Sequence, residues 1–305
     1  MLPLSPEAQL NATILAANPT AILVSSEAPT GPAPLRITIA TNGTGEITPC
    51  HIAAAPVGAT LRLVTLPAFR PLVCQPLAAS AHPNHTRCHN EPIPAGVQIA
   101  PRGATWVGTY GLPVRHRTAD GNFVYAALSN WHVMCLASSV AGHAECQPFA
   151  NANQFASLTR WHKPTASGQH LVDAAIADTL HDGRHTVDRV VLGLGPAGAL
   201  PHDLRVGDPV TKSGRTTGVT TGRVHATGAA VRVNYGTHTA ELVDQDVIID
   251  AGHSFSAAGD SGSAVLEASG RKPAALLFAG GGNLTIANPI RHVTEAMHLV
   301  WPVFS

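Results

Sequence analysis

The sequence predicts a mainly β protein with a small α/β region at its amino-terminal side. Through the last two thirds of the chain, short apolar or alternating runs recur with glycine-rich turns between them. Helical spacing of apolar residues is confined to the two ends of the chain. A series of short strands without long helices between them is typical of barrels and sandwiches. The expected strands of this part lie near residues 104–110, 123–128, 190–194, 219–227, 231–235, 247–249, 264–266 and 274–278.

The amino-terminal region begins with a good helix start. Ser5 can cap the helix, Pro6 suits the first turn, and Glu7 favours the positive end of the helix dipole. The helix is expected to reach about Ala17, because Asn18 and Pro19 stop it. Three strand-like runs follow at 21–25, 35–41 and 60–66. The expected organisation is a small α/β domain over 1–80, a linker over 81–94 and a main domain over 95–305.

The end of the main domain is predicted to be a helix. Ile290, Val293, Met297 and Val300 have the apolar spacing of one helical face, and Pro289 precedes them. A terminal helix of this length can pack on a barrel.

Composition limits the class of partner and the compartment. The chain has 305 residues, of which 45% are hydrophobic and 12% charged, with a formal net charge of zero. This balance argues against nucleic acid or a membrane surface as a partner. The first residues lack a basic region with a long apolar core, and the cysteines are odd in number: Cys50, Cys74, Cys88, Cys135 and Cys146. We therefore expect a cytoplasmic protein with reduced thiols, and the sequence leaves open whether it forms a homo-oligomer.

The most informative motif is the run Gly-Asp-Ser-Gly-Ser at 259–263. A serine between glycines can sit on a tight turn that points its hydroxyl and backbone N–H groups at one place. An acyl-transfer nucleophile needs that arrangement. Turns rich in these residues are common, so the motif gains weight only from partners elsewhere in the chain.

Two such partners precede Ser261. His132 follows the apolar run 125–128, where the end of a strand can hold an imidazole at a cleft. Asp173 lies near the start of the apolar run 171–177, where burial can fix its carboxylate against that imidazole. Asp178 and Asp188 compete for this role, although strand alternation places Asp173 and Asp178 on opposite faces. The chain order His, Asp, Ser matches one of the known orders of a catalytic triad.

These residues carry a resemblance to a known family. The triad order, the motif at 259–263, the stretch 210–224 with Lys212 to Gly218, and the runs 172–175 and 277–290 all contribute. Over roughly residues 93–300 the chain resembles a chymotrypsin-fold (trypsin-like, PA clan) serine peptidase of the intracellular bacterial and plant branch that includes NARROW LEAF 1. The resemblance implies two six-stranded antiparallel β-barrels with a cleft between them and a carboxy-terminal helix.

The resemblance also implies an activity and its residues. It implies a serine endopeptidase that needs no cofactor and no metal, acts on a protein or peptide, and uses His132, Asp173 and Ser261 as its triad. The N–H groups of Gly259 and Ser261 would form the oxyanion hole. Phe255 falls at the base of the primary pocket, and the opposite wall is expected along Phe278, Ala279, Gly280 and Gly281. Since no acidic residue stands at Phe255, we expect an apolar or small side chain before the cleaved bond.

Two departures from the secreted enzymes keep alternatives open. No cysteine directly follows His132, and we expect no free amino terminus to pair with Asp260. The sequence therefore leaves open an inactive binding protein with this fold, or a regulatory scaffold in which residues 1–80 bind a partner and proteolysis is triggered or self-directed. His82, His85, Cys88 and His89 have a spacing that permits a metal site, but a histidine-rich linker is the simpler interpretation.

Overall fold

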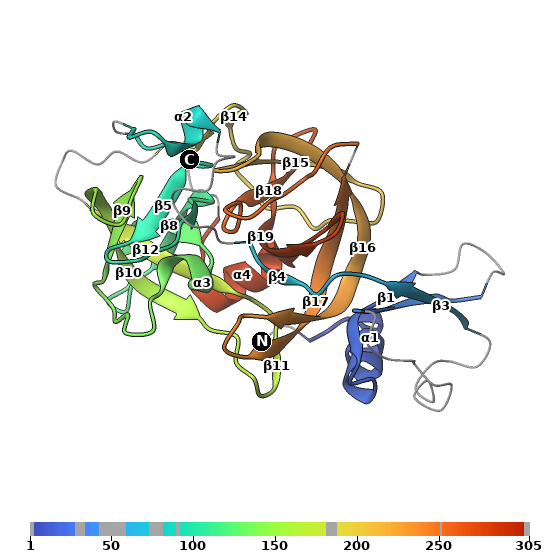
Figure 1. Ribbon diagram of the computed structural model, residues 1–305. Coiled ribbons are helices and arrows are strands. Elements are labelled where there is room, and N and C mark those ends of the chain that lie inside the picture. The colour runs from blue at the N-terminus through green and yellow to red at the C-terminus, as the bar shows by residue number, and fades with distance from the viewer. Residues whose placement is uncertain are drawn as a thin grey trace.

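The computed structural model describes residues 3–27, 34–42, 59–72, 82–89, 92–180, 188–250 and 252–301. Two curled sheets stand side by side, and a small group of elements from the amino-terminal region extends from one of them (Figure 1). The predicted mainly β fold with two barrels and a carboxy-terminal helix is confirmed.

The first barrel is built from the chain between residues 98 and 179. Its strands are β5 (Gln98–Pro101), β6 (Gly108–Thr109), β7 (Leu112–Arg117), β8 (Phe123–Ser129), β9 (Ala144–Gln147), β10 (Asn153–His162) and β12 (Ala174–Thr179). They hydrogen-bond in the order β6-β5-β9-β10-β12-β8-β7. Only Tyr110 and Gly111 separate β6 from β7, so the sheet curls back on itself. Alternate residues such as Ile99, Leu158 and Ala175 fill its interior.

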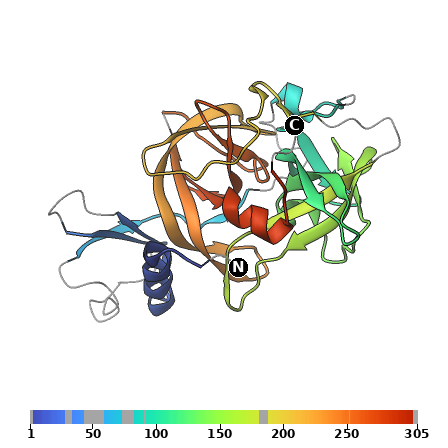
Figure 2. The ribbon, with the colours of Figure 1, turned by 180° about the vertical axis from the view of Figure 1, so that it is seen from behind.

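The second barrel contains the strands between residues 209 and 289. They are β15 (Pro209–Gly214), β16 (Gly218–Asn234), β17 (Thr239–Asp250), β18 (Ala264–Glu267), β19 (Pro273–Gly281) and β20 (Leu284–Pro289). Their order is β17-β20-β19-β18-β15-β16, and an additional pairing of β16 with β17 closes the six strands. Helix α4 (Ile290–Met297) follows and packs its apolar side on strands of both barrels (Figure 2).

The strand β16 is longer than the sequence indicates. The sequence predicts two separate strands here, at 219–227 and 231–235, with a glycine-containing turn between them. The structure has one continuous strand, in which Gly228 has φ 66° and lies where the register with β17 shifts between Ala226 and Ala229. The glycine therefore forms a bulge, and β16 continues beyond the barrel.

The amino-terminal elements attach to this extension of β16. Helix α1 (Pro6–Ala17) begins as predicted, with the Ser5 hydroxyl accepting from the Ala8 N–H. Strands β1 (Ala21–Glu27), β2 (Arg36–Thr41) and β3 (Thr60–Thr65) follow, and β1 pairs antiparallel with β16. The division of the chain near residue 80 stays a prediction, since these strands share one sheet with the second barrel.

The remaining elements are short. They are β4 (Arg70–Pro71), α2 (Pro83–Thr86), α3 (Trp131–Met134), β11 (Gln169–His170), β13 (Val190–Val191) and β14 (Gly195–Pro196). Within the described ranges, no helix has the length and apolar character needed to cross a membrane. Of the cysteines in those ranges, Cys88, Cys135 and Cys146 are free thiols.

Arg232 joins the amino-terminal helix to the second barrel. Its guanidinium donates to the carbonyls of Asn18 at 2.6 Å, Ala21 at 2.7 Å and Leu15 at 2.8 Å. Glu241 on the neighbouring strand pairs with the same guanidinium at 2.6 Å. One side chain on β16 thus binds the Leu15 carbonyl in the last turn of α1 and the carbonyls of Asn18 and Ala21 just after the helix.

We expect Arg232→Met to lower the free energy of unfolding by about 2–4 kcal/mol, because three carbonyls and one partly buried carboxylate each lose a charged donor. Urea unfolding measures the change, with Arg205→Met as control because Arg205 is exposed. Equal stabilities for the two variants would contradict this role of Arg232.

Candidate active site

The loop that carries Ser261 lies between β17 and β18 and is closely packed. Gly259 has φ 103° and Gly262 has φ 92°, which are left-handed conformations that favour glycine. A Cβ on Gly262 would lie 2.1 Å from the Ser129 hydroxyl of the first barrel. The second glycine of the motif is therefore needed because the loop touches the other barrel there.

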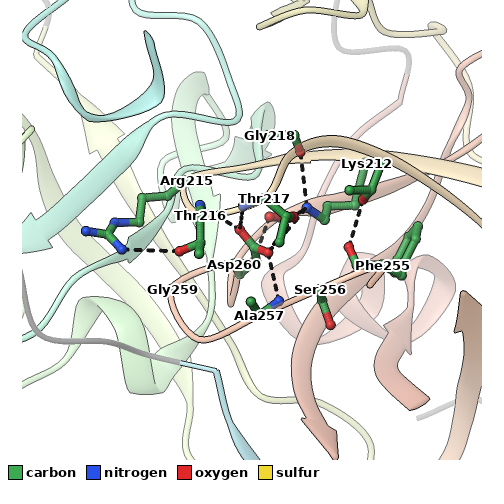
Figure 3. A network of polar contacts seen from close by, with 12 residues as sticks. Lys212, Arg215, Thr216, Thr217, Gly218, Phe255, Ser256, Ala257, Gly259 and Asp260 are labelled. Carbon is green, nitrogen blue, oxygen red and sulfur yellow. Dashed lines mark hydrogen bonds and ion pairs between the residues drawn. The ribbon is translucent and has the colours of Figure 1, made fainter. Parts of the chain in front are cut away.

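Asp260 holds this loop from inside the second barrel. Its Oδ1 accepts from the N–H of Thr216 at 2.8 Å and of Thr217 at 3.2 Å. Its Oδ2 accepts from the Thr217 hydroxyl at 2.7 Å and from the Ala257 N–H at 2.9 Å. The carboxylate thus ties the loop to the turn between β15 and β16, as Figure 3 shows.

A buried lysine supplies the opposite charge. The Nζ of Lys212, a β15 residue, lies 3.3 Å from the Asp260 Oδ2, and both side chains are fully buried. Burial lowers the pKa of Lys212, and the charge of Asp260 opposes that shift. The same Nζ also donates to Gly218 O at 3.1 Å and to the Thr217 hydroxyl (Figure 3). In this chain Lys212 therefore provides the cation that the sequence left unassigned.

His132 and Asp173 form a buried pair. His132 lies in α3, one short turn of helix that directly follows β8, and Asp173 immediately precedes β12. The imidazole Nδ1 is 2.5 Å from the Asp173 Oδ2, and the backbone N–H of His132 donates to Oδ1 at 3.3 Å. Since a carboxylate only accepts, Nδ1 carries a proton and Nε2 is the nitrogen that faces other groups.

Three residues that sequence reasoning did not identify hold Asp173 in place. The Tyr235 hydroxyl donates to its Oδ2 at 2.7 Å, the Asn288 amide oxygen accepts from its N–H at 3.0 Å, and the Asn130 amide donates to its carbonyl at 2.7 Å. Burial first, and then the charge of Asp173, raises the pKa of Tyr235 well above its usual value. Tyr235 thus remains a hydrogen-bond donor.

Ser261 reaches the same region from the other barrel. Gly108 lies between the two, because a Cβ there would be 2.6 Å from Val133, the neighbour of His132, and 3.1 Å from the Ser261 carbonyl. The Ser261 hydroxyl, however, donates to the Phe278 carbonyl at 2.9 Å. The Nε2 of His132 has no hydrogen-bond partner among the described residues. The structure brings His132 to Asp173 but records no bond from Ser261 to His132.

A residue of the amino-terminal region occupies the predicted oxyanion hole. The carbonyl of Leu72 accepts from the N–H of Ser261 at 3.3 Å and from the N–H of Gly259. The N–H of Leu72 donates to the Ser261 hydroxyl at 2.9 Å and to the Phe278 carbonyl at 3.3 Å. The two predicted donors therefore do converge on one oxygen, and Ser261 is fully covered.

The predicted pocket residues separate into two groups. Phe255 is fully buried in a cluster with Val224 and Leu277, and the side chain of Leu72 packs on that cluster. Gly280 also lies beside Leu72, since a Cβ there would be 3.1 Å from Leu72 Cδ1. The side chains of Phe278 and Ala279 belong to another cluster, which contains Phe69, so only the backbone of Phe278 faces Leu72. Gly281 lies beside Phe69 and Pro67.

Asp178, which competed with Asp173 for the role of the triad carboxylate, has another partner. It pairs with His116 at 2.7 Å, away from Asp173.

The linker histidines that permit a metal site also have other partners. In the linker, His85 contacts Ser213 through Nε2 at 2.8 Å and His82 through Nδ1 at 3.1 Å, while His89 contacts the Asn84 carbonyl at 2.7 Å. No cluster of three or more potential metal ligands occurs in the part of the chain that the structure describes.

Comparison with known proteins finds similarity in structure but not in sequence. No family model and no curated protein matches the chain. Among solved structures, Protease A of Thermobifida fusca is 17% identical with a TM-score of 0.51, and the match covers 69% of this chain and 98% of the protease. Nocardiopsis protease (NAPase) is 18% identical with a TM-score of 0.50, covering 68% of this chain and 98% of that one. The chain has the fold of the chymotrypsin-like serine proteases.

Proposed function

We propose that the chain is a serine endopeptidase that acts through an acyl-enzyme intermediate. One observation carries the proposal: the N–H groups of Gly259 and Ser261 both donate to a single peptide carbonyl, while the Ser261 hydroxyl accepts from the N–H of the same residue. Donors fixed in this way stabilise the negative oxygen that develops when a hydroxyl attacks a carbonyl carbon. In the proposed reaction His132, paired with Asp173, is the base that takes the proton of that hydroxyl.

The proposed reaction moves one proton twice. The Ser261 hydroxyl turns from the Phe278 carbonyl toward the Nε2 of His132, gives up its proton and forms a bond to the substrate carbonyl carbon. The imidazolium then protonates the departing amine, and Asp173 remains ionised and holds Nδ1. A water molecule repeats the sequence on the acyl-enzyme and releases the acid. Loss of one oxyanion donor costs about 3–4 kcal/mol in such reactions.

The primary pocket favours an apolar side chain. Phe255 and its neighbours form an apolar surface, and a leucine rests on it in this structure. Gly280 leaves room for that side chain, because a Cβ there would contact it. We therefore propose cleavage after leucine or a residue of similar size, and not after arginine or lysine, whose charge would lose its hydration in the pocket.

A fluorophosphonate probe tests the activity directly, because it reacts with an activated serine. The probe is applied to the natural chain and to Leu72→Asp, in which a charged side chain disfavours occupation of the apolar pocket. We expect the adduct on Ser261, measured by peptide mass spectrometry, and none in Ser261→Ala. Ser254→Ala is the matched control, because Ser254 is exposed. Absence of an adduct on Ser261 in both chains would overturn the proposed activity in favour of an inactive binding protein.

Lys212→Met is expected to impair both stability and the reaction of Ser261. It leaves the buried Asp260 carboxylate without its cation, at a cost of about 3–5 kcal/mol of unfolding free energy. The Gly259 and Ser261 N–H groups then lose their fixed direction, so the labelling rate is expected to fall about 100-fold. Lys272→Met is the control, because Lys272 is exposed.

The double variant Lys212→Met/Asp260→Asn is expected to regain most of the stability, since it removes both charges. If Lys212→Met alone had the same unfolding free energy and the same labelling rate as the chain of natural sequence, Lys212 would not hold the loop.

Tyr235→Phe is expected to lower kcat/KM for a leucine-containing peptide by about tenfold, because a hydrogen bond to a charged group contributes about 1.5–3 kcal/mol. The loss should appear mainly in kcat, since the Tyr235 hydroxyl binds and orients Asp173. Thermal unfolding checks that the fold is retained. A change confined to KM would contradict a positioning role.

A further inference from the structure

The segment 66–72 crosses from the amino-terminal sheet to the active site. It leaves the end of β3 and runs along the second barrel to β4, as both ribbon views show (Figures 1 and 2). Leu66 N–H still bonds the Thr41 carbonyl in the amino-terminal sheet at 2.8 Å, whereas Leu72 is bonded to the Ser261 loop. Seven residues thus connect the two regions directly.

The backbone of this segment pairs with β19 as an added strand. β4 runs antiparallel to β19, with Pro71 opposite Ala279 and Arg70 opposite Gly280. The N–H of Leu72 continues this ladder to the Phe278 carbonyl. An extended peptide that adds a strand to a sheet edge is recognised through its main chain, and its alternate side chains select the sequence.

Three consecutive glycines make room for the segment. A Cβ on Gly280 would be 3.1 Å from Leu72 Cδ1, one on Gly281 would be 3.2 Å from Phe69 Cδ1, and one on Gly282 would be 3.4 Å from Pro67. The segment therefore lies in close contact with β19 and the turn after it. Phe69 is fully buried, and its carbonyl accepts from the Asn234 N–H at 3.0 Å.

Leu72 supplies the side chain, the N–H and the carbonyl that a cleavable residue presents. Its side chain rests on the apolar cluster around Phe255, and its carbonyl oxygen lies between the N–H groups of Gly259 and Ser261. Its N–H is 2.9 Å from the Ser261 hydroxyl oxygen. The carbonyl carbon of Leu72 belongs to the same residue as this N–H and carbonyl oxygen, which are both bonded to the Ser261 loop. It is therefore next to the nucleophile.

From this arrangement we propose that the protein is its own substrate, cleaved by Ser261 at the peptide bond on the carboxyl side of Leu72. The inference rests on the proposed endopeptidase activity and adds its substrate: an internal Phe-Arg-Pro-Leu segment at 69–72. As long as it occupies the pocket, the segment excludes other peptides, since Ser261 has no exposed surface.

The step balances without any group beyond the chain and water. Ser261 Oγ forms an ester bond to the Leu72 carbonyl carbon, and the bond from that carbon to the nitrogen of residue 73 breaks. His132 takes the hydroxyl proton and delivers it to the departing amine. Water then hydrolyses the ester, which regenerates the serine and leaves Leu72 with a free carboxylate.

The experiment follows the mass of the full chain during incubation after purification. We expect one cut, between residues 72 and 73, identified by intact mass and by sequencing of the new amino terminus. Ser261→Ala and Leu72→Asp should stay uncut at this bond, and Leu72→Met, which keeps an apolar side chain, should still be cut. Leu63→Asp is the matched control, because Leu63 lies in the same region but is 56% exposed.

Fluorophosphonate labelling of the same proteins separates the possible failures. If the segment blocks the site, Leu72→Asp should label at Ser261 about tenfold faster than the uncut chain of natural sequence, because only the uncovered fraction reacts. Labelling of Ser261 without any cut after Leu72 would overturn the inference and leave the endopeptidase proposal standing. Absence of labelling in every chain would overturn the endopeptidase proposal itself.

Discussion

The buried charge of Asp260 is the constraint on which the active-site loop depends. A carboxylate without contact to water is stable only with donors around it and an opposite charge beside it. Here backbone N–H groups, the Thr217 hydroxyl and Lys212 provide both. Because Gly259 and Ser261 flank Asp260, the position of the carboxylate fixes the direction of their N–H groups. The geometry of the oxyanion hole is thus set in the interior of one barrel.

The base and the nucleophile come from different barrels, and small residues let them approach. Gly108 and Gly262 lie where the first barrel meets the Ser261 loop: a Cβ on Gly262 would collide with Ser129, and one on Gly108 would lie 3.1 Å from the Ser261 carbonyl. Asp173 shows the same dependence, because Asn288 and Tyr235 of the second barrel bind its backbone and carboxylate. Helix α4 adds an apolar contact with both barrels. The site is therefore a product of the interface between the barrels.

Local sequence predicted much of this arrangement, because some features depend on nearby residues alone. The helix start at Ser5, the glycine turn around Ser261 and the alternation that separates Asp173 from Asp178 are of this kind. Separate strands are predicted at 219–227 and 231–235, but pairing on both sides of Gly228 keeps β16 continuous as a bulged strand. Such pairing involves residues far apart in the chain, so local spacing does not reveal it.

The partners of the site were harder to predict for the same reason. Lys212 lies almost fifty positions before Asp260, and only the closure of the barrel brings the two together. Tyr235 and Asn288 occur in strand contexts that do not by themselves indicate a contact with Asp173. Leu72 is one apolar residue outside the runs that predict strands. Its contact with Ser261 depends on how β1 to β3 attach to β16.

The length of β16 has a consequence for the fate of the amino-terminal region. Its far half pairs with β1, and α1 is held there by Arg232, so α1 and β1 do not depend on the covalent chain after Leu72 to stay attached. A fragment ending at Leu72 would remain tethered noncovalently, with its new carboxylate at a high effective concentration beside the oxyanion hole. Its departure would then require local unfolding of an edge of the barrel sheet, which makes the lifetime of the bound product a property of sheet stability.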